Sequence, residues 1–120
     1  SEKIKSKSTS LNVNNLEKRE FVLVTGIADS SYLVKFLKDR NLVFTHLKYK
    51  DHYSYSKSSI NKIKRISEGK YILTTEKDFG KLKLKVKSRN LFYIEVGLNF
   101  INDNNELSFD NLIEKYVKEN

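Results

Sequence analysis

The sequence predicts an α/β fold, namely a three-layer α/β/α sandwich around a mostly parallel sheet of about four to five strands. Short apolar runs alternate with longer segments whose apolar residues recur at helical spacing. Residues 21–24 form a continuous apolar run, which is typical of a strand covered on both faces. Because strands and helices alternate along the chain, the connections between parallel strands should be right-handed crossovers.

The first strand is predicted at residues 21–24 and ends shortly before Gly26. This glycine suits a turn, and it would also allow a ligand to approach the backbone closely. Asp29 or Ser30 can cap the helix that follows, because their side-chain oxygens accept hydrogen bonds from free backbone N–H groups. That helix should bury one face and end at residues 39–41. Its apolar positions are Leu33, Phe36 and Leu37.

A second strand is predicted at residues 42–47 and a third at residues 71–73. His46 falls inside the second strand, where we expect a packed or edge-exposed side chain rather than a catalytic one. The helix between these strands is capped by Ser56 and ends near Gly69, because glycine adopts the left-handed conformation that commonly follows a helix. Its apolar positions are Ile60, Ile63 and Ile66.

Thr75 and Asp78 have the spacing of a capping box, with Asp in place of the usual Glu, so a short helix should begin at Glu76. A fourth strand is predicted at residues 91–96. Between them, residues 81–87 alternate lysine with an aliphatic residue. This alternation predicts an edge strand guarded by lysine or, as an alternative, a patch that faces anionic lipid. The four lysines are Lys81, Lys83, Lys85 and Lys87.

The two ends of the chain differ in character. Residues 1–18 are rich in Ser, Asn and Lys, and we interpret residues 1–20 as a linker or an edge ribbon that precedes a folded domain at residues 21–120. Residues 102–105 carry turn chemistry, and Ser108 is placed to cap an amphipathic C-terminal helix. The apolar positions of that helix are Phe109, Leu112, Ile113, Tyr116 and Val117.

Size and composition narrow the range of functions. A chain of 120 residues fits one domain, and its formal net charge of +8 suits phosphates, nucleic acid or an anionic membrane face. There is no cysteine and there are only two histidines, so we expect no metal site. We expect no membrane span or signal peptide, because no apolar run approaches the roughly 20 residues of a spanning helix. The chain has no methionine, and we interpret it as a piece cut from a larger protein.

Two polar runs follow predicted strands, at the sheet edge where open α/β folds keep their chemistry. The first is Asp51-His52, in which a carboxylate can orient an imidazole for proton transfer or both can hold a phosphate-bearing substrate. The alternative is a surface loop with a capping Asp. The second run places a lysine at a helix N-terminus, which attracts anions, so it could contact a phosphate. The alternative interpretation is a capped helix whose charged side chains are only solvated. This second run consists of Thr75, Glu76, Lys77 and Asp78.

The sequence contains neither G-x-x-x-x-G-K-[ST] nor G-x-G-x-x-G, so it predicts no nucleotide-binding loop of its own. Three other runs occur in a fixed order. They are residues 22–29 (Val-Leu-Val-Thr-Gly-Ile-Ala-Asp), Asp51-His52 and residues 73–78 (Leu-Thr-Thr-Glu-Lys-Asp). Taken together, they resemble the C-terminal half of the tetraacyldisaccharide 4'-kinases, the lipid A 4'-kinases of Gram-negative bacteria. The resemblance covers about residues 21–82, and the last third matches only in its order of strand and helix.

The resemblance implies a kinase peripheral to the cytoplasmic face of the inner membrane. Such a kinase transfers the γ-phosphoryl of ATP, with Mg²⁺, to the 4'-hydroxyl of tetraacyldisaccharide 1-phosphate and so forms lipid IVA. In that family an N-terminal P-loop domain holds ATP, and a smaller C-terminal α/β/α domain packs against it across the catalytic cleft. This chain is similar to the second domain only, so alone it should bind no cofactor and catalyse nothing. The implied partners are the P-loop domain in cis, the lipid substrate and an anionic membrane surface, with no nucleic acid.

By position in the family pattern, His52 corresponds to an active-site histidine that pairs with a catalytic aspartate of the P-loop domain, and Asp51 would orient it. For the second run, the resemblance implies a helix cap or a supporting role in the cleft. The chain departs from the family's F-P-D-H-H pattern at three positions. Loss of the proline removes a fixed φ before Asp51, and loss of the second histidine removes a group that titrates near neutral pH. The departures are Tyr49 for Phe, Lys50 for Pro and Tyr53 for His.

Two other classes of protein remain open from the residues alone. One is a basic α/β module that binds nucleic acid, for which the charge, seven tyrosines and seven phenylalanines are mild support. Its binding should weaken steeply as salt rises. The other is a purely structural interaction module, in which loss of the His52 side chain would have no effect on activity.

Overall fold

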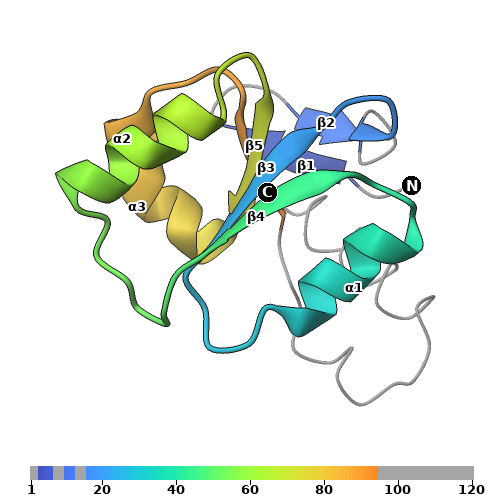
Figure 1. The fold of residues 1–120 in the computed structure, drawn as a ribbon, viewed down its shortest axis with the longest axis horizontal. Coiled ribbons are helices and arrows are strands. Elements are labelled where there is room, and N and C mark those ends of the chain that lie inside the picture. Colours follow the sequence, from blue (N-terminus) through green and yellow to red (C-terminus); the bar gives the residue numbers. More distant parts are fainter. Residues whose placement is uncertain (1–2, 7–9, 13–15, 95–120) are drawn as a thin grey trace.

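The computed structural model describes residues 3–6, 10–12 and 16–94, and the predicted α/β sandwich is confirmed (Figure 1). Within these described residues, the sheet has six strands in the order β2-β1-β6-β5-β3-β4. The predicted C-terminal helix and the end of the predicted fourth strand lie outside the described residues. The strands are β1 (Lys3–Ser6), β2 (Ser10–Asn12), β3 (Phe21–Thr25), β4 (Phe44–Lys48), β5 (Tyr71–Thr75) and β6 (Leu91–Ile94), and the helices are α1 (Ser31–Asp39), α2 (Lys57–Ile66) and α3 (Glu76–Val86).

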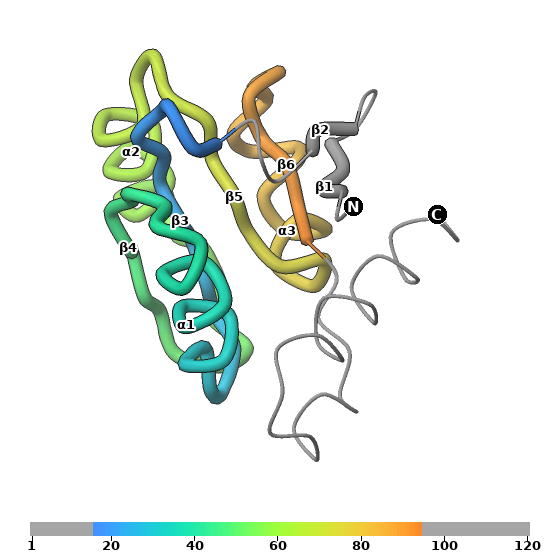
Figure 2. Tube along the Cα trace, turned by 90° about the vertical axis from the view of Figure 1, so that its right-hand side faces the viewer, coloured from blue at the N-terminus to red at the C-terminus, as the bar shows by residue number. Residues whose placement is uncertain are grey.

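Four of the strands are parallel and form the centre of the fold. β3 pairs in parallel with β4 on one side and β5 on the other, and β5 pairs in parallel with β6. Figure 2 shows these four strands side by side in the order β4, β3, β5, β6. The short strands β1 and β2 extend the sheet, because β1 pairs antiparallel with both β6 and β2. The N-terminal segment therefore contributes an antiparallel edge to a parallel sheet.

Helices cover both faces of this sheet, as the continuous apolar run of β3 predicts. Alternate residues of β3 enter two different hydrophobic clusters, since successive side chains of a strand point to opposite faces. Phe21 and Leu23 pack in the cluster that contains the buried residues of α1. Val22 and Val24 pack in the cluster formed with α2 and α3. Figure 1 shows α1 on one side of the strands and the other two helices on the opposite side.

The helix starts follow the predicted capping residues. At α1 the N-cap residue Ser30 makes no side-chain cap bond. The side chain of Asp29 supplies the hydrogen bonds at this helix start instead. Its Oδ1 accepts from the Ser31 backbone N–H at 2.9 Å and from the Ser31 hydroxyl at 2.6 Å. At α2 the Ser56 hydroxyl accepts from the Ser59 N–H at 3.2 Å, as predicted. Gly69, three residues after α2, has the positive φ of 74° expected of it.

The prediction of an edge strand at residues 81–87 was wrong, because α3 continues through this segment to Val86. Lysine and leucine are both strong helix formers, so a well-capped helix extends over them despite their alternation. Leu82 and Val86, one turn apart, are buried, while Leu84 between them is 66% exposed. The four lysines therefore do not share one face. Within the described residues, no helix is both long and apolar enough to cross a membrane.

Candidate functional site

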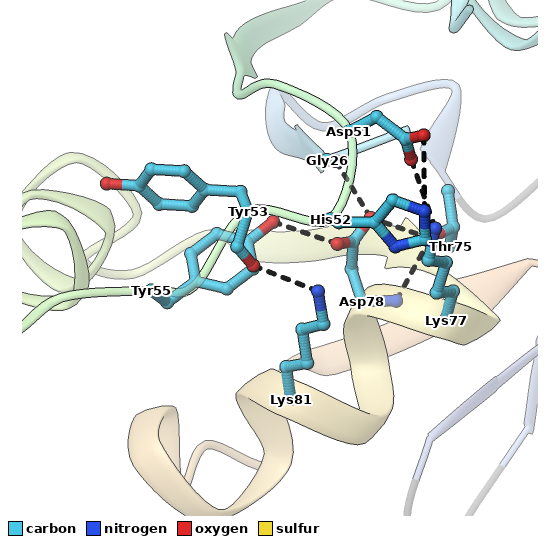
Figure 3. A network of polar contacts seen from close by, with 9 residues as sticks. All are labelled: Gly26, Asp51, His52, Tyr53, Tyr55, Thr75, Lys77, Asp78 and Lys81. Atoms are coloured by element: carbon cyan, nitrogen blue, oxygen red, sulfur yellow. Dashed lines mark hydrogen bonds and ion pairs between the residues drawn. The ribbon is translucent and has the colours of Figure 1, made fainter. Parts of the chain in front are cut away.

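The topology brings three strand ends together at one edge of the sheet. β3 connects through α1 to its neighbour β4, while β5 connects through α3 to β6 on the opposite side. The carboxyl ends of β3 and β5 therefore flank a topological switch point, which is where open α/β sheets form a crevice. Figure 3 shows the residues that follow β3, β4 and β5 meeting there. These are Gly26 after β3, Asp51 and His52 after β4, and Thr75, Lys77 and Asp78 around the end of β5.

Asp78 lies where these strand ends meet, and its side chain is fully buried. Its Oδ2 accepts hydrogen bonds from the Gly26 backbone N–H at 2.8 Å and from the Thr75 hydroxyl at 2.7 Å. Its Oδ1 accepts from the Tyr55 hydroxyl at 3.1 Å. The Thr75 hydroxyl in turn accepts from the Asp78 N–H at 3.1 Å, so the predicted helix cap is confirmed. One carboxylate thus ties together the loops that follow β3, β4 and β5.

Gly26 is required by the closeness of these groups. A Cβ atom at this position would lie 2.8 Å from Asp78 Oδ1, 3.1 Å from the Tyr55 hydroxyl and 3.3 Å from the carbonyl oxygen of Lys50. Contacts under 3.0 Å are shorter than van der Waals packing allows. The glycine therefore serves the approach of the protein's own carboxylate, where the sequence suggested a turn or an external ligand.

Asp51 and His52 form a tight turn at the same edge of the sheet. The Tyr53 N–H donates to the Lys50 carbonyl at 3.2 Å, and the His52 N–H donates to the Gly26 carbonyl at 3.2 Å. His52 has a φ of 58°, in the left-handed region that few residues with a side chain adopt. Its side chain is 76% exposed, so the imidazole is presented to solvent and to whatever binds at this edge.

Asp51 links the two polar runs that the sequence singled out. Its Oδ2 lies 3.4 Å from the Nε2 atom of His52, and its Oδ1 accepts from the Lys77 ammonium at 3.1 Å. The hydrogen bond from Lys77 lowers the pKa of the Asp51 carboxyl below its usual value. Near neutral pH the group is therefore a carboxylate, with one oxygen toward a lysine and the other toward an imidazole. This arrangement can hold an imidazole in a fixed orientation.

Comparison with known proteins shows the family of this chain. The sequence pattern of the family described as tetraacyldisaccharide-1-P 4'-kinase matches residues 2–118. The chain belongs to this family. The predicted resemblance is thereby confirmed, and it extends well past the segment on which it was based.

Curated relatives in the kinase family support the assignment. The tetraacyldisaccharide 4'-kinase of Flavobacterium psychrophilum is 38% identical over 117 residues, which are 98% of this chain and 33% of the relative. That of Flavobacterium johnsoniae is 30% identical over 117 residues, with the same coverage. That of Pelagibacter ubique is 31% identical over 100 residues, which are 79% of this chain and 31% of the relative. The chain thus spans about a third of the length of these relatives. No solved structure matches the chain.

Tyr55 belongs to the site but was not predicted from the sequence. Its ring packs edge-on against Tyr49 and Tyr53, with centroids 5.3 and 4.9 Å away, and Tyr49 and Tyr53 stack at 4.5 Å. Burial raises the pKa of the Tyr55 hydroxyl far above its usual value, so it remains a hydrogen-bond donor to Asp78. The only signal in the sequence is the clustering of three tyrosines within seven residues after β4, which suggests packing but not a partner.

The remaining predicted residues take different places. Glu76 is exposed in the first turn of α3. Lys81 and Lys85 donate to backbone carbonyls of the loop after β4. Lys83, Lys85 and Lys87 are exposed. Their predicted contact with anionic lipid stays a prediction.

His46 lies apart from the site, on strand β4. Its Nε2 is 2.8 Å from the Thr25 hydroxyl, and burial lowers the pKa of its imidazole. Within the described part of the chain, no group of three or more His, Cys, Asp or Glu side chains is arranged to hold a metal ion.

Proposed function

We propose that this chain is the C-terminal domain of a tetraacyldisaccharide 4'-kinase. The whole enzyme would transfer the γ-phosphoryl of ATP to the 4'-hydroxyl of tetraacyldisaccharide 1-phosphate, forming lipid IVA in lipid A biosynthesis. Membership of the kinase family supports the reaction class. Coverage of about a third of each relative supports the assignment to one domain of a longer protein.

The observation that carries the proposal is the exposed Asp51–His52 pair at the carboxyl edge of the sheet. His52 is presented outward, and a carboxylate oxygen lies 3.4 Å from its Nε2. In the proposed enzyme, His52 would hold a catalytic aspartate of the P-loop domain, and this aspartate would accept the proton of the attacking hydroxyl. Asp51 would orient His52. The carboxylate of Asp51 is available for this because the hydrogen bond from Lys77 keeps its pKa low.

ATP and Mg²⁺ would be held by the N-terminal P-loop domain in cis. The sequence lacks a phosphate loop, which supports placing the nucleotide site outside this chain. We therefore expect the 120-residue chain alone to show neither ATPase nor kinase activity. A clean preparation that hydrolysed ATP, or phosphorylated the disaccharide, would contradict this assignment.

We further propose that the enzyme acts at the cytoplasmic face of the inner membrane, as a peripheral protein, since its substrate is a lipid. The formal charge of +8 is compatible with an anionic membrane surface. Lys83 and Leu84 on α3 and the C-cap residue Lys87 are exposed, Leu84 by 66%, so the end of this helix is the segment that would meet lipid.

The test of the site is replacement of His52 in the complete enzyme. Because φ is 58° at this position, His52→Asn is a better variant than His52→Ala, since Asn tolerates the left-handed region. We expect kcat to fall by about 100-fold or more in both variants, the scale for loss of an acid–base group. His46→Gln removes the other histidine and should leave kcat within about twofold of the wild type. If His52→Asn kept a near wild-type kcat, His52 would be an ordinary loop residue.

A further inference from the structure

Three lysines of α3 donate hydrogen bonds to alternate residues of the loop that joins β4 to α2. Each lysine follows the last by four residues, and four helical residues advance about 6 Å. Two residues of extended chain advance about 6.6 Å, so the spacing of Lys81 and Lys85 matches that of Tyr53 and Tyr55. Asp51 lies in the tight turn before them, and Lys77 reaches it through the Asp51 side chain. We call the three residues the lysine ladder. Its bonds are Lys77 Nζ to Asp51 Oδ1 at 3.1 Å, Lys81 Nζ to Tyr53 O at 2.9 Å and Lys85 Nζ to Tyr55 O at 2.9 Å.

Two of these bonds fix the backbone itself, because Lys81 and Lys85 bind carbonyl oxygens in partly buried positions. Hydrogen bonds with a charged donor are roughly twice as strong as neutral ones. The third bond, from Lys77, occupies one oxygen of Asp51 and leaves the other facing His52. Exposed lysines elsewhere on α3, such as Lys83, lie outside this pattern.

The turn that carries His52 needs such support. A non-glycine residue in the left-handed region persists only when its surroundings impose that conformation. The two backbone bonds of the turn are both 3.2 Å long, at the far end of the usual range. The lysine ladder approaches the loop from α3, whereas the Gly26 carbonyl approaches it from β3. The turn is therefore held from two sides.

We propose that the lysine ladder positions the His52 turn, and that Lys77 orients Asp51 toward the imidazole of His52. The inference rests on the proposed function in one respect, namely that the positioned histidine is the one used in catalysis. Lys77, Lys81 and Lys85 are positioning residues, because they act on the reaction through His52. If the α3 lysines acted only through their positive charge, replacing any lysine of this helix would change the exchange rates and kcat equally.

Hydrogen exchange of backbone amides tests the ladder without reference to activity. In this 120-residue chain, we expect the His52 and Tyr53 amides to exchange at least tenfold faster in the Lys77→Met/Lys81→Met variant than in the wild type. The matched control is Lys83→Met, which removes charge from the same helix and should change these rates less than twofold. Unchanged exchange in the double variant, or an equal effect of the control, would overturn the ladder.

Kinetics of the complete kinase test whether the ladder acts through His52. We expect Lys81→Met to lower kcat about tenfold with KM for ATP changed less than twofold, and Lys81→Arg to restore most of the loss. In a His52→Asn background, Lys81→Met should cause no further loss, because residues that act as a unit are not additive. An equal loss in both backgrounds would overturn the positioning role. Lys62→Met, on the exposed side of α2, is the activity control and should be silent.

The two experiments separate failure of the ladder from failure of the proposed function. If His52→Asn were fully active, the catalytic role of His52 and its positioning for catalysis would both be refuted. The exchange rates would still decide whether the lysines hold the turn. If exchange quickened as expected while Lys81→Met kept full kcat, the ladder would be a structural feature only, which would also overturn the positioning role.

Discussion

Removal of the Asp78 side chain should strongly destabilise this fold, because its buried carboxylate is shared by three loops. In Asp78→Ala, the Gly26 N–H and the Tyr55 hydroxyl lose their acceptor inside the protein. Hydrogen bonds to a charged group contribute about 1.5–3 kcal/mol each, and bonds that share one carboxylate do not add independently. We expect the free energy of unfolding to fall by about 3–5 kcal/mol, the scale for breaking a buried charged network. That is a large part of the roughly 5–15 kcal/mol that stabilises an ordinary domain.

Asp78→Asn is the matched variant, because it preserves the shape of the side chain. Its carbonyl oxygen can accept from the Gly26 N–H and the Thr75 hydroxyl. Its amide N–H can donate to the Tyr55 hydroxyl, which rotates to accept. We expect this variant to lose only about 1–2 kcal/mol, since most hydrogen bonds survive without the charge.

Urea unfolding of the 120-residue chain, followed by circular dichroism, measures both variants. The slope with denaturant should stay constant, so the midpoint alone should report the change in stability. The hydrogen-bond argument would be refuted if Asp78→Ala lay within about 1 kcal/mol of the wild type, the usual effect of a substitution with no special mechanism. It would also be refuted if the Asn variant were as unstable as the Ala variant, because charge rather than bonding geometry would then be decisive.

Two further predictions concern neighbouring positions. Gly26→Ala should lower the free energy of unfolding by about 1–3 kcal/mol through overpacking, because its Cβ would lie 2.8 Å from Asp78 Oδ1. Adding Tyr55→Phe to this variant should not fully restore stability, since the Asp78 oxygen remains. The midpoint of urea unfolding measures this, and a stable Gly26→Ala protein would show that the loops can move apart. Burial lowers the pKa of His46 from 6.5, so the folded state binds fewer protons than the unfolded state below that pH, and stability should fall as pH decreases from about 7 to 5. The His46→Gln variant should lose less stability than the wild type between about pH 7 and 5. Equal losses would show that the pKa of His46 is not lowered by burial.

Local signals were sufficient to predict most of the described elements. The continuous apolar run at residues 21–24 predicted a strand covered on both faces, and the structure places its residues alternately in two hydrophobic clusters. Ser56 and Thr75 predicted helix starts because capping is a contact between residues three apart. The strand prediction for residues 81–87 failed because aliphatic residues at every second position also include pairs that are four residues apart, which is a helical spacing. Leu82 and Val86 use that second spacing to bury one face of a helix.

The candidate site was only half predictable, because its decisive contacts join distant parts of the chain. Asp51 and His52 could be placed at a strand end from the order of predicted strands and helices along the sequence. The partners of Asp78, by contrast, lie 52 residues away at Gly26 and 23 residues away at Tyr55. No local spacing encodes such contacts, which exist only once parallel strands have brought their carboxyl ends to one edge. The left-handed conformation of His52 likewise depends on contacts from β3 and α3.

The antiparallel pairing of β1 with β6 has a consequence for how this region can be divided. Lys5 and Ser6 lie opposite Tyr93 and Phe92, so the N-terminal segment completes the hydrogen bonding of a strand that follows it by more than eighty residues. A version of the chain that started at Phe21 would leave one side of β6 open. Exposed strand edges recruit strands from other molecules, and proteins avoid aggregation by covering them. Residues 1–20, predicted to be a linker or an edge ribbon, therefore contain a strand that covers this edge of the parallel core.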